Sequence, residues 1–482
     1  MSEHVGYVVR VSELKDHPNA DRLKVATFFG NDTCVSIDTA IGEIGIYFPC
    51  DLQLSEEFCD ANHLCRKTAD GKPDTGYLER EKRNVRAIKL RGVKSDGIFM
   101  SLSCLEYTGV NFDDIDIGDT ISVVNGHEIC KKYIPRGTKQ NRQGHPSEGN
   151  RTRKRHDPIA PLLAEHADTE QLAYNLGAFK PGDLIEITLK MHGTSQRTGY
   201  LPMLHSYTGP NWAHIVIKHP KLFKRLQGKA NAALSPIYEY GYVSGTRRTV
   251  LNDWEGGFYG SNEFRKKHAE FFEGKLHKGE EVFYEVVGFT DAGLPIMGDC
   301  QNKKLNDKEF VKQYGEVTRF SYGCSCTGYY TYGDGSYDTL PKSDFYVYRM
   351  TMTNEDGDVV EYTPDFMRYR CEQMGCKCVP VLWKGFIEEP CICGYGDCAD
   401  YKFNPGEYIK NIAEQYYDGP DPIGKTHVRE GVVVRIVNKP KFCAYKHKNF
   451  AFKCLEGIVK NEETTPDMEE AEDLIQEEKN NE

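Results

Sequence analysis

The chain has 482 residues and a formal net charge of −11, with 61 Lys and Arg against 72 Asp and Glu. This length allows about three domains with sizeable cores. No stretch approaches the roughly 18 apolar residues of a membrane span, and the first residues lack the basic-then-apolar pattern of a secretory signal. We therefore expect an intracellular, cytoplasmic protein without a membrane partner, and the net charge taken alone argues against nucleic acid.

The first 130 residues contain short runs rich in Val, Ile, Phe and Tyr, punctuated by Gly, Pro, Asn and Asp. Short apolar runs separated by turn-forming residues are typical of antiparallel strands in small barrels. We therefore predict that residues 1–130 form a small antiparallel β-barrel domain. The predicted strands include Tyr7–Val11, Arg22–Phe28 and Val85–Leu90.

A strongly basic segment follows this region. Between Lys131 and His156 there are nine Lys and Arg and one acid, Glu148, a net charge of +8. Apolar residues are almost absent from it, so we expect residues 131–158 to form a flexible linker. The linker is either a solvated spacer or an electrostatic contact to a phosphate backbone.

The last residues carry most of the negative charge. Residues 462–482 contain ten acids and one lysine, a net charge of −9, so the rest of the chain carries only −2. We expect 461–482 to form a largely disordered acidic tail, because so few apolar residues cannot bury enough surface to fold. The net charge of the whole chain therefore does not exclude a nucleic-acid partner.

Residues 159–460 mix apolar runs of strand length with segments of helical periodicity, and the strands do not alternate regularly with helices. We find neither a Walker P-loop nor a Rossmann glycine motif. The prediction is an α+β domain of mainly antiparallel sheets with flanking helices. Predicted helices are Pro161–Gly177, Ser261–Phe272 and Asn404–Tyr416, and predicted strands are Leu184–Leu189, Val282–Val287, Phe345–Met352 and Val432–Val437.

The chain has 17 cysteines, and without a secretory signal we expect free thiols in a reducing compartment. Eight of them lie in a Cys-rich segment around 320–400, which we interpret as an insertion. Their spacings lack the paired CxxC of a structural zinc site, so ordinary thiols and a site for Zn²⁺ both stay open. The eight are Cys324, Cys326, Cys371, Cys376, Cys378, Cys391, Cys393 and Cys398.

Two N-terminal segments carry motifs of a known nucleic-acid-binding fold. Residues 17–25 are HPNADRLKV, and residues 88–98 are IKLRGVKSDGI. In this order they resemble the HPNAD-x-L and LRGV-x-S-x-G motifs of the tRNA-binding OB-fold found with some aminoacyl-tRNA synthetases. Because Pro, Asn and Asp form turns in any protein, a purely structural role for the first motif is the alternative.

This resemblance implies an OB-type barrel that binds RNA through basic side chains and stacking aromatic rings. The spacing of the basic residues does not place them all on one strand face, so some would serve only solvation. The candidate nucleic-acid contacts are Arg86, Lys89, Arg91 and Lys94, and the candidate stacking rings are Phe28, Phe29 and Phe99.

A predicted strand ends in Lys190 and runs into Met191-His192-Gly193-Thr194. A lysine in this position can project into a pocket, and Gly193 lets the backbone approach a phosphate closely. A lysine is a nucleophile when its amine is neutral. The K-x-x-G pattern is weak alone, and an exposed lysine at a turn is the alternative.

Four later segments supply matching chemistry in a fixed order. Glu285 and Glu430 are carboxylates suited to a hydrated metal or a ribose, and Tyr348 offers an aromatic face to a base. Lys446 and Lys448 are two residues apart on a predicted strand, so they share one face and suit a triphosphate. Together these groups provide what attack on a nucleotide α-phosphate requires.

The ordered series KxxG, EVVG, an aromatic strand, EGVVV and KxK resembles motifs I, III, IIIa, IV and V of the covalent nucleotidyltransferase superfamily. That superfamily contains ATP-dependent DNA and RNA ligases and mRNA capping enzymes. His192 departs from the Asp or Asn of most members, and the K-x-H-G-T form is similar to RNA-editing and related RNA ligases. With its N-terminal OB motifs, the chain resembles nick-sealing RNA ligases that carry an OB domain before the nucleotidyltransferase domain.

The resemblance implies that Lys190 takes AMP from ATP as a lysyl phosphoramidate, with Glu285 and Glu430 holding Mg²⁺ or Mn²⁺. Arg247 matches a further motif, Ia, although Arg248 is the adjacent alternative. For His192 a turn-ordering role is the alternative to a role in binding. The residues that the resemblance assigns to the nucleotide are His192, Gly193, Arg247, Glu285, Tyr348, Glu430, Lys446 and Lys448.

The expected function is therefore ATP-dependent joining of an RNA 3′-hydroxyl to a 5′-phosphate, at nicks, with RNA as the partner. Two other classes stay open. One is a DNA ligase or a GTP-dependent capping nucleotidyltransferase. The other is a non-enzymatic protein that binds tRNA or other RNA through the N-terminal domain.

Overall fold

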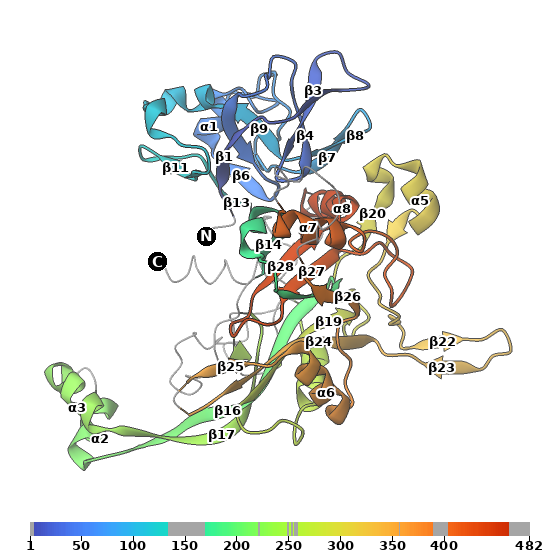
Figure 1. Cartoon of the computed structure of the whole chain (residues 1–482). Helices are drawn as coiled ribbons and strands as arrows, with labels where there is room; N and C mark the ends of the chain where they lie inside the picture. Colours follow the sequence, from blue (N-terminus) through green and yellow to red (C-terminus); the bar gives the residue numbers. More distant parts are fainter. Residues whose placement is uncertain are drawn as a thin grey trace, which may run out of the picture.

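The structure, a computed structural model, describes residues 4–133, 169–388 and 403–461, apart from short gaps at 220–221, 248–249, 252–253, 255–258 and 356. Most of the predicted linker, three cysteines of the Cys-rich segment and the acidic tail lie outside the described residues. The described chain forms an N-terminal unit, drawn in blue and cyan, and a larger C-terminal unit, drawn from green to red (Figure 1).

The N-terminal unit consists of short antiparallel strands and one helix. Its larger sheets have the orders β10-β1-β5-β9 and β2-β3-β4, and the other strands form two-stranded pairs. The predicted antiparallel pairing is confirmed, but the pairings among the described strands do not close a single barrel. The elements are β1 (Gly6–Arg10), β2 (Leu14–Asp16), β3 (Leu23–Phe28), β4 (Asn31–Ser36), β5 (Ile44–Phe48), β6 (Leu52–Leu54), α1 (Glu56–Ala61), β7 (Ala87–Leu90), β8 (Val93–Asp96), β9 (Ile98–Ser101), β10 (Thr120–Ile121), β11 (Val123–Val124), β12 (His127–Glu128) and β13 (Cys130–Lys132).

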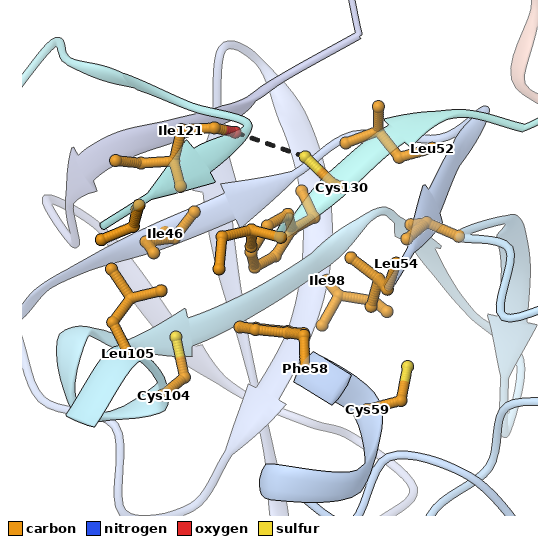
Figure 2. Packing of buried hydrophobic residues seen from close by; sticks show 14 of the residues in the cluster. Ile46, Leu52, Leu54, Phe58, Cys59, Ile98, Cys104, Leu105, Ile121 and Cys130 are labelled. Carbon is orange, nitrogen blue, oxygen red and sulfur yellow. Dashed lines mark hydrogen bonds between the residues drawn. The ribbon is translucent and has the colours of Figure 1, made fainter. Parts of the chain in front are cut away.

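An apolar core holds this unit together (Figure 2). Leu52 and Leu54, which alternate along β6, are fully buried and share the core with Phe58 of α1. Fully burying one such side chain stabilises the fold by about 1.5–3 kcal/mol. The Cys130 thiol donates a hydrogen bond to the Ile121 carbonyl at 3.3 Å, which joins β13 to the end of β10.

The two N-terminal sequence motifs contact each other. His17 is buried, and its Nε2 donates to the Leu90 carbonyl at 3.1 Å. Asn19 Nδ2 donates to the Arg91 carbonyl at 2.9 Å, and Arg91 Nη1 donates back to the Asn19 carbonyl at 3.2 Å. These contacts support the structural interpretation of the HPNAD segment, since it orients the β7–β8 turn.

The C-terminal unit contains two large sheets. One has the order β14-β28-β27-β15-β26 and the other β18-β17-β16-β19-β24-β25. All neighbouring strands in them are antiparallel except β14 and β28, so a mixed fold with mainly antiparallel sheets is confirmed. Their bounds are β14 (Glu170–Gln171), β15 (Leu184–Lys190), β16 (Thr194–Thr208), β17 (Ser235–Gly245), β18 (Val250–Leu251), β19 (Glu280–Gly288), β24 (Ser343–Thr353), β25 (Val359–Glu361), β26 (Val381–Phe386), β27 (Gly431–Ile436) and β28 (Ala444–Lys448).

Helices and small hairpins complete this unit. Within the described residues, none of the helices is both long and apolar enough to span a bilayer. The helices are α2 (Asn211–Lys218), α3 (Gln227–Ala233), α4 (Glu263–Glu270), α5 (Lys308–Tyr314), α6 (Pro364–Met374), α7 (Pro405–Glu414) and α8 (Phe450–Asn461), and the short strands are β20 (Cys300–Gln301), β21 (Val317–Thr318), β22 (Tyr329–Thr331) and β23 (Tyr337–Thr339).

The two sheets meet where β15 passes through Met191–Gly193 into β16. Leu189 and Met191 belong to one apolar cluster with Val287 of β19 and Phe452 of α8, which fills the space between the sheets. Along β19 the side chains alternate, as a period of two requires, so that Val287 belongs to this cluster while Val286 belongs to the cluster with Phe264 of α4 and Met367 of α6. The apolar cluster between the sheets therefore includes Met191, the residue that follows the predicted nucleophile.

One predicted helix is wrong in its described part. Within Pro161–Gly177, the described residues form β14 and two short 3-10 turns, Leu172–Tyr174 and Leu176–Ala178. The leucines at helical spacing, Leu172 and Leu176, pack on the five-stranded sheet from successive turns instead. The other predicted helices and strands of this unit are confirmed, with boundaries shifted by a few residues at most.

Acidification is expected to weaken the packing of α4 on β24. His268 Nε2 lies 3.0 Å from Ser343 Oγ, and burial lowers the pKa of His268 from 6.5 to about 4. The unfolded chain then binds a proton at a higher pH than the folded chain, so stability falls as the pH drops from 6.5 to 4. The full loss is about 3 kcal/mol at about 1.4 kcal/mol per pKa unit.

Denaturant unfolding of the wild type and of His268→Gln across this pH range measures the effect. The variant keeps a hydrogen-bonding side chain that does not titrate, so its free energy of unfolding should fall less steeply with acid. Parallel pH profiles for the two proteins would contradict the assignment.

Candidate active site

Three neighbouring strands align the predicted nucleophile with a second lysine. Lys190 of β15 pairs with Gly431 of β27, and Gly431 pairs with Lys448 of β28. A Cβ on Gly431 would lie 2.1 Å from the His447 carbonyl oxygen, so only glycine fits between the flanking strands. Lys190 and Lys448 therefore flank Gly431, one on each side, and Gly431 has no side chain.

Glu430 joins these two lysines. Its Oε1 lies 2.7 Å from Lys190 Nζ and 3.6 Å from Lys448 Nζ, and its side chain is only 3% exposed. Burial alone would raise the pKa of Glu430, but Lys190, His192 and Lys448 outweigh this effect and lower it to about 2. Glu430 is therefore a carboxylate at every physiological pH.

The second carboxylate oxygen of Glu430 is buried beside His192. This oxygen, Oε2, accepts no hydrogen bond from the described residues, although His192 Nδ1 lies 3.6 Å away. Carboxylate oxygens are the preferred ligands of Mg²⁺ and its hydration shell, and they also accept hydrogen bonds from hydroxyl groups. The chemistry of this position therefore fits a hydrated divalent cation or a ribose.

His192 is held tightly beside this carboxylate. Its ring packs edge-on against Phe320 and Phe452, with centroid separations of 4.6 and 4.7 Å. Its backbone N–H donates to Tyr322 Oη at 2.7 Å. The structure thus supports the turn-ordering role for His192 and adds a contact of its imidazole with Glu430.

Gly193 lies against β19. A Cβ there would be 2.4 Å from the Val286 carbonyl oxygen and 2.9 Å from Glu285 Cγ. Because one of these atoms is backbone, any side chain must push the turn away from the strand. The requirement for glycine is thus a close approach between the two sheets.

Gly193→Ala is expected to displace the turn after Lys190 and to reduce its reaction with a nucleotide about 10²-fold, since displacements near 1 Å cost that much. Gly199→Ala, in the next part of β16, is the matched control, because its Cβ would meet only the Leu201 side chain. Single-turnover labelling of the two variants compares them. Equal rates would contradict the close-approach argument.

The second sheet brings Glu285 and Tyr348 to the same region. Glu285 pairs with Ser195 in the β16–β19 register and is half-buried, whereas Tyr284 and Val286 beside it are fully buried. Tyr348 Oη and Ser195 Oγ form a hydrogen bond at 3.0 Å. Tyr348 is left out of the β19–β24 register at a bulge, a feature common beside binding sites.

The other residues predicted to contact the nucleotide differ in how far their side chains are buried. Lys446 is half-buried on β28, two residues before Lys448, whose Nζ also lies 2.8 Å from Glu456 Oε2. His447 between them is buried and faces Glu414 of α7, so both lysines face the opposite side. Arg247 follows the end of β17 and is half-buried, while Arg248 is outside the described residues.

The predicted nucleic-acid contacts of the N-terminal unit largely face the C-terminal unit. Lys89 Nζ forms an ion pair with Asp307 at 2.6 Å, and Lys94 Nζ lies 5.3 Å from the centre of the Phe450 ring. Arg86 lies beside Gly457 of α8. Arg91, at the β7–β8 turn, is exposed.

Of the proposed stacking rings, Phe28 is buried, whereas Phe29 and Phe99 are half-buried. Phe28 is 3% exposed and stacks on Phe99, so it has no open face for a base. Phe29 contacts Tyr174, which comes from the C-terminal unit. The expectation that these rings form an open platform is therefore wrong for Phe28 in this arrangement.

Sequence analysis missed Arg265. Its guanidinium is buried and donates from Nη1 to the Ser195 carbonyl at 3.1 Å and from Nη2 to Thr194 Oγ1 at 2.6 Å. These bonds hold the start of β16, directly after the nucleophile turn. Nothing in the local sequence marks Arg265, because it lies in a polar helix far along the chain.

A zinc site in the Cys-rich segment is not supported. Within the described ranges, no group of three His, Cys, Asp or Glu side chains is arranged to hold a metal ion. The cysteines described there are free thiols. Cys391, Cys393 and Cys398 lie outside the described residues.

Comparison with known proteins identifies solved structures that share the fold of the chain. No protein-family model and no curated protein matches the chain. Solved structures of Naegleria gruberi RNA ligase variants do match: one holds AMP and manganese and two hold ATP and manganese. These three are 14% identical to the chain, cover 93% of it and 97% or 98% of their own length, and have TM-scores of 0.50 to 0.51. The chain therefore has the overall fold of the Naegleria gruberi RNA ligase.

Proposed function

We propose that the protein is an ATP-dependent RNA ligase that joins 3′-hydroxyl and 5′-phosphate ends at nicks through a lysyl-AMP intermediate on Lys190. The observation that carries this proposal is the arrangement of Lys190 and Lys448 around the buried carboxylate of Glu430. It supplies a nucleophile, a second cation for phosphates and an anion that holds both in place. The shared fold with an RNA ligase supports the same assignment.

The chemistry has three steps. The neutral amine of Lys190 attacks the α-phosphorus of ATP, a P–N bond forms, and the P–O bond to pyrophosphate breaks. An oxygen of the RNA 5′-phosphate then attacks the same phosphorus, and the P–N bond breaks, so AMP passes to the RNA end. The 3′-hydroxyl finally attacks the RNA phosphorus, a phosphodiester forms, and AMP leaves.

The other residues of the site hold and orient the substrate in this proposal. Glu285 and Glu430 hold Mg²⁺ or Mn²⁺, which neutralises phosphate charge when bound. Tyr348 stacks on adenine, Lys446 and Lys448 contact phosphates, and Gly193 lets the turn approach the nucleotide. His192 fixes that turn through its aromatic contacts, and Arg247 completes the nucleotide contacts.

The domain assignment is part of the proposal. We assign residues 1–130 to an OB-type nucleic-acid-binding domain, 131–158 to a basic linker, 159–460 to the nucleotidyltransferase domain and 461–482 to an acidic tail. Of the basic residues assigned to RNA, Lys89, Arg91 and Lys94 are exposed and Arg86 is half-buried. Arg86, Lys89 and Lys94 would bind RNA only from the edge of the contact between the two units.

A joining assay tests the proposal. The protein is incubated with ATP, Mg²⁺ and nicked duplexes in which the 3′-hydroxyl strand is either RNA or DNA. We expect joining with ATP on the RNA 3′-hydroxyl and little with DNA there. Preference for DNA would indicate a DNA ligase, use of GTP without joining would indicate a capping enzyme, and RNA binding without any adenylate would indicate a non-enzymatic protein. Each of these results would overturn the proposal.

A further inference from the structure

A long arm extends from the C-terminal unit. It is built from β16 and β17, and α2 and α3 lie at its far end (Figure 1). We define the tip of the arm as residues 205–238. β16 begins at Thr194, four residues after the proposed nucleophile, and Thr194–Gly199 pair with β19 before the arm extends from the sheet.

The tip is a folded module with a small core of its own. Ala213 and Val216 of α2 pack against Ala230 of α3 and Leu234, and all four are buried. At its entrance, a Cβ on Gly209 would lie 2.6 Å from the Ala233 carbonyl oxygen, so the turn fits closely under α3. This packing fixes which side chains of the tip face solvent.

The tip is strongly basic in an acidic protein. Residues 205–238 contain five Lys and Arg and no Asp or Glu, whereas the whole chain has a net charge of −11. Three of the lysines, Lys218, Lys224 and Lys229, are exposed, as is Arg225. With no carboxylate in the segment to neutralise them, these cations give the tip a positive field that attracts phosphates.

Apolar side chains lie among these cations. Trp212 is 46% exposed and Ile215 is 53% exposed, and both share one face of α2 with Lys218. Exposed aromatic rings between cations suit the bases and backbone of a nucleic acid, since rings stack on bases while cations contact phosphates. A protein partner would use the same apolar groups but would not account for the absence of carboxylates.

The length of the arm determines how far from Lys190 the tip would contact a nucleic acid. β16 has 15 residues, which at about 3.3 Å each span roughly 50 Å. B-DNA would need about 15 base-pair steps at ~3.4 Å per step to cover this span, and an A-form RNA duplex needs a few more because its rise per step is smaller. A duplex with its nick at Lys190 would therefore reach the tip about one and a half helical turns away.

We infer that the tip is a second RNA-binding surface, which contacts the backbone of the duplex flanking the joined end. This inference rests on the proposed function and adds to it a place where the substrate is held far from the reacting atoms. Its cations would raise RNA affinity without taking part in adenylate formation.

The test compares two triple variants of the full chain. The tip variant carries Lys218→Ala, Lys224→Ala and Lys229→Ala. The control carries three equal charge losses at exposed lysines of the C-terminal unit outside the tip, Lys267→Ala, Lys312→Ala and Lys377→Ala. The probe is a fluorescein-labelled nicked RNA duplex with about 20 base pairs on each side of the nick, and its affinity is measured by anisotropy at several salt concentrations.

We expect the tip variant to bind the probe about tenfold more weakly than the control and to have a salt slope smaller by about 2 to 3. The difference should disappear when both flanks are cut to about 8 base pairs, which cannot reach the tip. Trp212→Ala should weaken binding while leaving the salt slope unchanged. Labelling of Lys190 with ATP should be equal in the tip and control variants.

Equal RNA affinity of the tip and control variants would overturn the inference, and the tip would then be a surface for a protein partner. This result is distinguishable from failure of the proposed function, because RNA binding is measured without ATP. A wild type that binds the long duplex through the tip yet forms no adenylate would refute the ligase proposal alone.

Discussion

Replacing Lys190 with alanine is expected to abolish covalent attachment of AMP. The amine is the only group in the proposed site that forms a bond to phosphorus, and loss of a covalent nucleophile lowers the rate on the order of 10⁴-fold or more. Incubation with α-labelled ATP and Mg²⁺, followed by denaturing electrophoresis, measures the retained label. The wild type should retain label and Lys190→Ala should retain none.

Lys190→Arg separates the charge of the side chain from its nucleophilicity. Arginine keeps a positive charge next to Glu430, 2.7 Å away in the wild type, but its guanidinium does not deprotonate. We expect a folded protein that still binds ATP and forms no adenylate. Lys446→Ala serves as the control that removes a cation while keeping the nucleophile, and it should retain measurable label. Full labelling of either Lys190 variant would refute the assignment of the nucleophile.

Glu430→Gln is expected to have the second largest effect. The substitution removes the charge that lies between Lys190 and Lys448, and removing one partner of a buried ion pair costs about 3–5 kcal/mol. It also removes the carboxylate assigned to the metal or ribose. We expect adenylate formation to fall about 10²-fold or more at a temperature where the variant is folded.

A control variant with a similar loss of stability separates destabilisation of the fold from loss of adenylate formation. Glu280 is also fully buried, and Arg370 donates two hydrogen bonds to it, each 2.8 Å long. Glu280→Gln should therefore destabilise the fold by a similar amount, yet it lies in the six-stranded sheet away from the nucleophile. Thermal unfolding and labelling are measured for both variants. If Glu280→Gln lost labelling as severely as Glu430→Gln at matched folded fractions, Glu430 would have only a structural role.

The strands of the site follow from local sequence. Lys446 and Lys448 had to share a face because strand side chains alternate, and the structure buries His447 on the other face. The Lys190–Gly431–Lys448 row could not be predicted, because register between strands depends on packing far along the chain. Sequence supplied the residue types, and tertiary pairing determined which of them meet.

The contacts of His192 show the same limit. Its partners Phe320, Tyr322 and Phe452 lie more than 100 residues away and carry no local signal for this contact. The departure of His192 from the motif that the sequence resembles was visible in the sequence, but its contacts required the fold. An imidazole enclosed by two rings can order the turn where a shorter carboxylate or amide would leave space.

Part of the N-terminal unit lies against another part of the chain. Phe28 is of the type that stacks on bases, and Lys89 of the type that binds phosphates. In the structure Phe28 is buried and Lys89 pairs with Asp307 of the C-terminal unit. Residue type alone does not reveal which side chains contact another unit, although Lys89, Arg91 and Lys94 remain exposed.

The most direct test of the account is to locate AMP on the protein. Wild-type protein is incubated with ATP and Mg²⁺, digested under mildly alkaline conditions that preserve a phosphoramidate, and analysed by tandem mass spectrometry. We expect AMP on Lys190, and its loss after mild acid treatment. AMP on another residue, or none in a folded protein that binds ATP, would contradict it.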